Sequence, residues 1–199
     1  MNQHSESSTI DYYDKLAAEY IATTAALDMS ELYEPFLNRL PKKGDILDAG
    51  CGSGRDSKAF MNRGFHVTSI DASSKMVEAT TLLTGQEAMQ VTFQTLSLTE
   101  NFDGIWACAS LLHVPMKQLP NVLKRLAKAL RPSGTIYASF KEGCEERVLD
   151  GRLFNDLNES RFRSLVDPIE ELRIAKTWLT DDLRAERRET WFNVLLIRK

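Results

Sequence analysis

The chain has 199 residues, of which 43% are hydrophobic, and its formal net charge is −3. This length and apolar content suit one globular domain with a substantial core. The lack of a basic surplus argues against a nucleic-acid-binding protein. No apolar run approaches the roughly 20 residues of a membrane-spanning helix, and residues 1–9 lack the apolar core of a signal peptide. The three widely spaced cysteines favour a reduced, cytoplasmic protein over a disulfide framework or a metal site.

The first 43 residues are predicted to form a helical segment behind a short disordered tail at residues 1–9. Residues 10–26 carry aromatic and aliphatic side chains at helical spacing. Asp28-Met-Ser-Glu31 has the form of a capping box and opens a second helix up to Leu40, in which Pro35 predicts a kink or a late start. We expect residues 10–43 to lie as a lid over an α/β core of residues 44–199.

The core opens with a strand, a glycine-rich turn, a helix and a second strand. The turn has three glycines at alternate positions, Gly50, Gly52 and Gly54. Glycine can adopt positive φ and lets a ligand approach the backbone closely. Asp71 ends the second strand about 20 residues after the turn, where a carboxylate can accept both hydroxyl groups of a ribose.

The rest of the core is predicted to alternate helices with strands. After a helix capped by Ser73 or Ser74, the expected elements are strands at 91–95 and 105–109, a helix at 119–130, a strand at 135–140, a helix capped by Asn158, and strands at 172–178 and 191–197. The loop at 180–189 is too short and too charged for a crossover helix. The last two strands should therefore pair as an antiparallel hairpin.

The glycine spacing separates two classes of cofactor-binding protein. Dinucleotide-binding proteins use G-x-G-x-x-G, whereas this chain has Gly50-x-Gly52-x-Gly54 followed by Arg55. From Asp48 to Asp71 the chain resembles the class I S-adenosylmethionine-dependent methyltransferases. Residues 102–115 and the turn at 130–134 resemble later motifs of that family, and the chain from about residue 11 onward resembles its tellurite-resistance-type branch. The resemblance implies a Rossmann-like three-layer sandwich with a seven-stranded, mostly parallel sheet and an antiparallel C-terminal hairpin.

The resemblance also implies a binding site for S-adenosyl-L-methionine. The residues expected to hold this cofactor are Asp48, Gly50, Cys51, Gly52, Arg55, Asp71, Ala72, Met76, Leu96, Cys108, Ala109 and Tyr13. In this scheme the glycine loop lies against the methionine part, Asp71 binds the ribose, and Leu96 meets the adenine edge. Residues 95–97 lack the acidic side chain that many relatives place near the adenine amino group, so a backbone amide would have to serve.

Two of these roles have alternatives. Arg55 can pair with the cofactor carboxylate, because a guanidinium matches a carboxylate geometrically, while the adjacent Asp56 can simply favour the helix dipole. Tyr13 and its neighbours Tyr12 and Tyr20 can be ordinary core residues, or one phenol can reach the cofactor from the lid.

His113 and Lys141 are the candidate catalytic residues, because each follows a strand at the edge where the acceptor should lie. His113 can act as a general base, as a hydrogen-bond donor or as a packing residue. Lys141 can bind an anionic acceptor or lie in a solvated loop. This cationic edge suits an acceptor that arrives already ionised, such as a thiolate, a carboxylate or a chalcogen oxyanion.

The leading hypothesis is thus a cytoplasmic methyltransferase acting on a small-molecule acceptor, as a monomer or homodimer, without nucleic acid or membrane partners. After the fourth strand the sequence lacks the Asp/Asn-Pro-Pro-aromatic motif of amino-methylating DNA enzymes, and we expect no appended domain that would grip a macromolecule. A regulatory or sensor module that binds the cofactor without turnover is the alternative. The glycine spacing disfavours a third hypothesis, a nicotinamide-dependent oxidoreductase.

Overall fold

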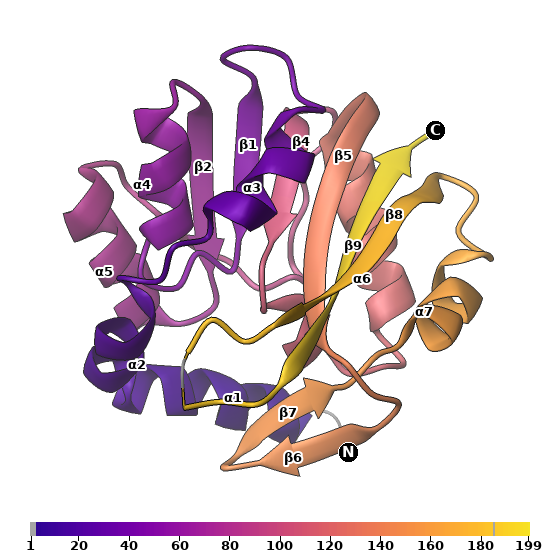
Figure 1. Cartoon of the computed structure of the whole chain (residues 1–199). Coiled ribbons are helices and arrows are strands. Elements are labelled where there is room, and N and C mark those ends of the chain that lie inside the picture. Colours follow the sequence, from indigo (N-terminus) through magenta and orange to yellow (C-terminus); the bar gives the residue numbers. More distant parts are fainter. Residues whose placement is uncertain (1–2, 185) are drawn as a thin grey trace.

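A seven-stranded sheet forms the centre of the protein, and the computed structural model describes residues 3–184 and 186–199 of the chain (Figure 1). The strands lie in the order β3-β2-β1-β4-β5-β9-β8. Their bounds are β1 (Asp45–Ala49), β2 (His66–Asp71), β3 (Met89–Gln90), β4 (Phe102–Ala107), β5 (Leu130–Lys141), β8 (Leu172–Asp181) and β9 (Thr190–Arg198). The first five pair in parallel, whereas β9 is antiparallel to both β5 and β8. The predicted mostly parallel sheet with an antiparallel C-terminal pair is confirmed.

Successive residues of the central strands point into two separate cores, as the period of two in a strand requires. In β1, Ile46 packs on one face and Leu47 on the other, and Trp106 and Ile105 divide in the same way in β4. One face is covered by α3 (Ser30–Leu37) and α4 (Arg55–Asn62), with α5 (Ser74–Thr84) beside α4; the other is covered by α6 (Leu119–Ala129) and α7 (Glu159–Val166). This is the predicted three-layer arrangement.

Two predicted helix caps are confirmed. The Ser73 hydroxyl accepts the Met76 N–H at 3.2 Å and opens α5, while the Asn158 side-chain oxygen accepts the Arg161 N–H at 2.9 Å and opens α7. Each cap satisfies a backbone donor that has no partner within its helix.

The N-terminal segment differs from the prediction. Helix α1 runs from Gln3 to Lys15, so residues 3–9 are helical where a disordered tail was expected; residues 1 and 2 lie outside the described part. The single helix predicted for residues 10–26 is two helices, because the backbone at Leu16 leaves helical geometry before α2 (Ala17–Thr24). Helix α3 belongs to the core, since its Phe36 is fully buried, so only α1 and α2 lie over the strand ends.

One further prediction was wrong, and one element was missed. No strand forms at 91–95: the third strand is only the two residues of β3 before it, and residues 92–95 form a turn in which the Thr95 N–H donates to the Thr92 carbonyl oxygen at 3.2 Å. A second sheet, the hairpin of β6 (Glu146–Leu149) and β7 (Arg152–Asn155), was not anticipated. It lies beside α1 below the main sheet (Figure 1). Among the described helices, none has both the length and the apolar character needed to cross a membrane.

Candidate active site

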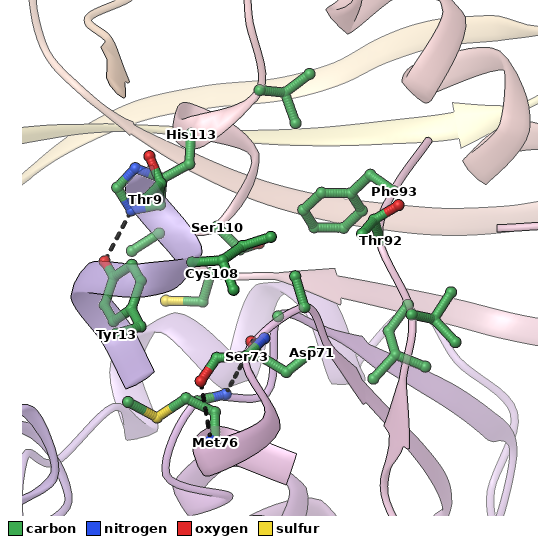
Figure 2. Close-up of a pocket in the computed structure, with 18 of the residues that line it drawn as sticks. Thr9, Tyr13, Asp71, Ser73, Met76, Thr92, Phe93, Cys108, Ser110 and His113 are labelled. Atoms are coloured by element: carbon green, nitrogen blue, oxygen red, sulfur yellow. Dashed lines mark hydrogen bonds between the residues drawn. The ribbon is translucent and has the colours of Figure 1, made fainter. Parts of the chain in front are cut away.

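A cavity of about 110 Å³, which we call the strand-end pocket, lies where β1, β2 and β4 end, against α1 (Figure 2). Five segments line it: α1 (Thr9, Ile10, Tyr13), the glycine loop (Gly50, Gly52), the end of β2 with the start of α5 (Ile70–Ser73, Met76), residues 91–94, and residues 108–110, 113 and 114 after β4. Tyr20 of α2 completes the lining. Ligands of open α/β sheets bind at this carboxyl edge of the strands.

The glycine loop brings backbone, without side chains, to the floor of the strand-end pocket. Gly50 has φ +89°, and a Cβ at this position would lie 2.4 Å from the Cβ of Ser110. The N–H groups of Gly50 and Cys51 both donate to the Ile70 carbonyl oxygen, at 2.8 and 3.0 Å. Glycine is therefore required at position 50 for both backbone conformation and space.

Asp71 presents a fixed carboxylate to the same pocket. Its Oδ2 accepts the Gly52 N–H and its Oδ1 accepts the Ser73 N–H, each at 2.9 Å. Each carboxylate oxygen has a second lone pair for a ligand hydroxyl. Burial raises the pKa of Asp71, while the backbone N–H groups oppose that rise. The orientation of the carboxylate is therefore set before any ligand arrives.

The apolar wall of the pocket agrees with the sequence in part. Met76 and Ala72 line it as predicted, and Figure 2 shows Phe93 on the side opposite Tyr13. Leu96 does not line the pocket, because the turn at 92–95 directs it into the hydrophobic core. Residues 91–94 form the wall expected there.

Asp48, which precedes the glycine loop, and Cys51, which lies within it, do not line the strand-end pocket. The Ser57 hydroxyl donates to Asp48 at 2.6 Å, and burial together with the nearby Asp56 raises the pKa of Asp48 to about 8. The Thr80 hydroxyl donates to the Cys51 sulfur at 3.2 Å, and burial raises the pKa of this thiol. A buried thiol with a raised pKa is a poor nucleophile.

Arg55 pairs with its neighbour and lies outside the strand-end pocket. Its Nε is 2.6 Å from Asp56 Oδ1, and its Nη1 donates to the Thr24 carbonyl oxygen at 3.1 Å. Asp56 also accepts the Tyr33 hydroxyl at 2.6 Å and the Trp106 indole N–H at 2.8 Å. Burial alone would raise the pKa of Asp56, but Arg55 and these donors lower it overall. Asp56 therefore links α3, α4 and β4 through buried hydrogen bonds, which is a larger role than the helix-dipole interaction expected from the sequence.

A second cavity of about 210 Å³, the hairpin cavity, adjoins the strand-end pocket. It is lined from α2 and α3, β5, the β6–β7 hairpin and the loop between β8 and β9. Five residues line both cavities: Tyr13, Tyr20, Cys108, Ala109 and His113. Cys108 and Ala109 thus lie at the boundary, as their predicted position at the end of the fourth strand implied, although β4 itself ends at Ala107.

Tyr13 and His113 meet at this boundary (Figure 2). The Tyr13 hydroxyl is 2.8 Å from His113 Nε2, and His113 Nδ1 is 2.6 Å from the Leu153 carbonyl oxygen. A carbonyl can only accept, so Nδ1 carries the proton and Nε2 accepts the Tyr13 O–H. Burial lowers the pKa of His113 to about 4 and raises that of Tyr13 to about 12. Both groups are therefore neutral near pH 7.

Lys141 lies at the predicted edge but is not a free cation. Its Nζ forms an ion pair with Glu189 on the loop before β9, and it stands 5.0 Å from the centre of the Phe154 ring. The side chain is only 9% exposed, which contradicts the solvated-loop alternative. Glu189 Oε2 is buried without a hydrogen-bond partner among the described residues.

Sequence reasoning missed the residues that the β6–β7 hairpin contributes, among them Arg152 and Phe154. A signal was present: Asp150-Gly151 separates two short runs that contain apolar residues, which is typical of a two-residue hairpin turn. Glu189 had no such signal, because its place in the cavity depends on the path of a long charged loop.

The chain is similar in sequence to known methyltransferases. Residues 46–134 match the family model of a methyltransferase domain. A ubiquinone biosynthesis O-methyltransferase of Idiomarina loihiensis is 31% identical over 101 residues, which are 47% of this chain and 41% of that protein. The chain therefore spans about two fifths of that relative's length.

Solved structures share the fold over nearly the whole chain. The 1,6-didemethyltoxoflavin-N1-methyltransferase of Burkholderia thailandensis, solved with 1,6-didemethyltoxoflavin and S-adenosylhomocysteine, has a TM-score of 0.79 at 19% identity and covers 98% of this chain and 87% of its own. The magnesium protoporphyrin IX methyltransferase of Synechocystis, solved with S-adenosylmethionine, has a TM-score of 0.74 at 18% identity and covers 98% and 97%. The fold is that of the S-adenosylmethionine-dependent methyltransferases.

Proposed function

We propose that this protein is an S-adenosylmethionine-dependent methyltransferase that acts on a small-molecule acceptor. The observation that carries the proposal is the pair of adjoining cavities, which share the Tyr13–His113 boundary. A group transfer requires a donor site that opens directly onto an acceptor site, so that the reacting atoms are held in line.

The strand-end pocket fits the donor molecule. Asp71 offers two oriented carboxylate oxygens for ribose hydroxyls, and Met76 and Phe93 supply apolar surface for a flat base. Gly50 and Gly52 leave the loop open where the methionine part would lie. When bound, S-adenosylmethionine supplies an activated methyl group on its sulfonium.

The residues at the boundary orient the acceptor and exclude water. The acceptor lone pair would approach the methyl carbon from the hairpin cavity, past the Tyr13–His113 hydrogen bond, and α1 would help to exclude water there. His113 has its proton on Nδ1 and its Nε2 engaged by Tyr13, which makes it a weak base. We infer that the acceptor arrives as an anion or with a neutral lone pair, and that it enters through the hairpin cavity.

A sensor module is the second candidate function, because it would need the strand-end pocket alone. The hairpin cavity argues against a sensor. Two buried polar atoms of residues that line it, Glu189 Oε2 and Arg152 Nε, have no hydrogen-bond partner among the described residues. Proteins rarely leave such groups unsatisfied unless a ligand completes them.

The test is production of S-adenosylhomocysteine from S-adenosylmethionine in the presence of separate acceptors: carboxylates, thiols, phenols and, for the tellurite-resistance-type assignment, selenite and tellurite. We expect product with one acceptor class and none with Asp71→Ala at low cofactor concentration. Cofactor binding without turnover on every class would favour the sensor. Cytoplasmic location and a monomeric or homodimeric state remain predictions from the sequence.

A further inference from the structure

Three cationic side chains surround the Phe154 ring beside the active site. Lys141 Nζ, Arg152 Cζ and Arg147 Cζ lie 5.0, 5.1 and 5.2 Å from the ring centre. Lys141 and Arg147 each form an ion pair with a carboxylate at hydrogen-bond distance. Arg152 differs from the other two because its nearest carboxylate is farther away.

Arg152 has only a distant, largely exposed counter-ion among the described residues. Its nearest carboxylate is that of Asp150, at 3.7 Å, whose side chain is 66% exposed, whereas the Arg152 side chain is 14% exposed. Its guanidinium also interacts with the Tyr13 hydroxyl, but its Nε is buried without a hydrogen-bond partner among the described residues. A largely buried charge with a distant counter-ion and an unpaired donor costs stability, so a requirement outside folding is indicated.

The Arg152 guanidinium is nevertheless held in place. It stacks over the Tyr12 ring of α1 at 4.0 Å, and Phe154 flanks it at 5.1 Å. Its backbone position is fixed by the β6–β7 hairpin, whose Leu153 N–H donates to the Thr9 hydroxyl at 3.1 Å. The arginine is therefore pre-organised for a ligand between two aromatic rings.

Arg152 lines the hairpin cavity next to the boundary with the strand-end pocket. It is near enough to Tyr13 to oppose the burial that raises the pKa of that phenol. After burial, Arg152 and Lys141 also help lower the pKa of His113, so the histidine adds no positive charge. Of the three cations around Phe154, Arg152 is the one whose charge is balanced least closely.

We propose that Arg152 binds a carboxylate group of the methyl acceptor. The inference rests on the proposed function and names the substrate class of that same site. A guanidinium binds a carboxylate through two parallel hydrogen bonds, and one weakly balanced charge matches a monoanion. The apolar remainder of such an acceptor would lie along Leu149 and Leu183, which line the hairpin cavity and are 44% and 50% exposed.

Calorimetry on the full chain saturated with S-adenosylhomocysteine tests this. The probes are matched pairs of a carboxylate and its amide: octanoate with octanamide, and phenylacetate with phenylacetamide. The wild-type protein should bind at least one carboxylate about 10-fold or more tightly than its amide. Arg152→Gln should remove that preference, and Arg152→Lys should keep part of it, because lysine retains the charge without the planar fork.

Arg147→Gln is the matched control, because Arg147 lies over the same ring, is ion-paired with Asp156 and does not line the cavity. It should keep the full carboxylate preference. Equal binding of carboxylates and amides by the wild type, or full preference in both Arg152 variants, would overturn the inference. If Arg152→Gln does not fold, as judged by circular dichroism, the wild-type and Arg152→Lys results decide. Failure of S-adenosylhomocysteine to bind the wild type would instead refute the proposed function itself.

Discussion

Backbone of the glycine loop forms the floor of the strand-end pocket, whereas paired side chains line the hairpin cavity. Gly50 and Gly52 and the N–H groups that hold Asp71 come from a continuous stretch of β1, α4 and β2. The hairpin cavity instead joins α1 to the β6–β7 hairpin and to the loop before β9, which are far apart in the sequence. A short motif can encode the first site, while the second depends on tertiary packing.

The charges follow the same division. Asp71 is the only carboxylate among the described residues that line the strand-end pocket, whereas the hairpin cavity contains partly buried ion pairs such as Lys141–Glu189 and Arg184–Asp182. Substitutions in the first site should therefore change donor binding, and substitutions in the second should change acceptor use.

Gly50→Ala should have the largest effect on the strand-end pocket. The new Cβ would lie 2.4 Å from Ser110, in a backbone conformation with φ +89°. We expect S-adenosylmethionine affinity to fall about 100-fold or more, measured by calorimetry. Gly64→Ala is the control, because Gly64 has φ +87° but no described atom within 4 Å of the place that an added methyl group would take. This variant should lose only roughly 1–2 kcal/mol of folding stability, from left-handed backbone strain. Equal loss of cofactor affinity in both variants would show that backbone strain, and not the clash with Ser110, weakens binding.

Asp71→Ala should weaken cofactor binding about 10- to 100-fold, because charge-assisted hydrogen bonds to the ribose are lost. Acceptor affinity in the S-adenosylhomocysteine-saturated protein should not change. Asp45→Ala serves as control, since Asp45 begins β1 at the opposite edge of the sheet and pairs with Arg131. Unaltered cofactor affinity in a folded Asp71→Ala variant would give this carboxylate another role.

His113→Ala should reduce single-turnover methyl transfer by less than the roughly 100-fold lost with a general base. The pKa of His113 is lowered to about 4, so the wild-type rate should show no inflection from this residue between about pH 6 and 9. A loss of about 1000-fold, with disappearance of a wild-type inflection in that range, would instead make His113 the base.

The same lowered pKa predicts acid sensitivity of the fold. Folded His113 stays neutral down to about pH 4, whereas in the unfolded chain it takes up a proton near its ordinary value of 6.5. The unfolded state therefore binds more protons in this window. The contribution of neutral His113 to the free energy of unfolding is fully present above pH 6.5 and is lost as the pH falls toward 4. His113→Gln should flatten this dependence by about 1–2 kcal/mol in urea unfolding. His66→Gln, at the exposed start of β2, should leave it unaltered.

Hydrogen exchange should show the smallest effect, and it tests whether α1 and α2 act as a lid. Asp14 of α1 accepts the Ser73 hydroxyl at 2.5 Å, so α1 is already tied to the start of α5. Cofactor should add protection to the amides of residues 10–24 and little to α3, whose Tyr33 and Phe36 are buried in the core. Equal exchange with and without cofactor would mean that α1 and α2 are purely structural.

The sequence predicted several features that follow from local chemistry. The glycine loop, the Ser73 and Asn158 caps and the alternating strands could be predicted because each follows from neighbouring residues. Leu96 was misplaced because a threonine turn follows β3. Arg55 was assigned to the cofactor carboxylate on guanidinium geometry, but the carboxylate that it pairs with is the neighbouring Asp56. The hairpin cavity could not be predicted, since its ion pairs join segments whose proximity appears only in the folded chain.

The division between the two sites rests on the identity of the molecule in the strand-end pocket. Titration calorimetry of the wild-type protein with S-adenosylmethionine, S-adenosylhomocysteine, NAD and NADP measures it directly. The geometry of Gly50, Gly52 and Asp71 predicts binding of both methionine-derived ligands, with no heat from either nicotinamide cofactor. Binding of NAD or NADP, with both methionine-derived ligands silent, would contradict the account.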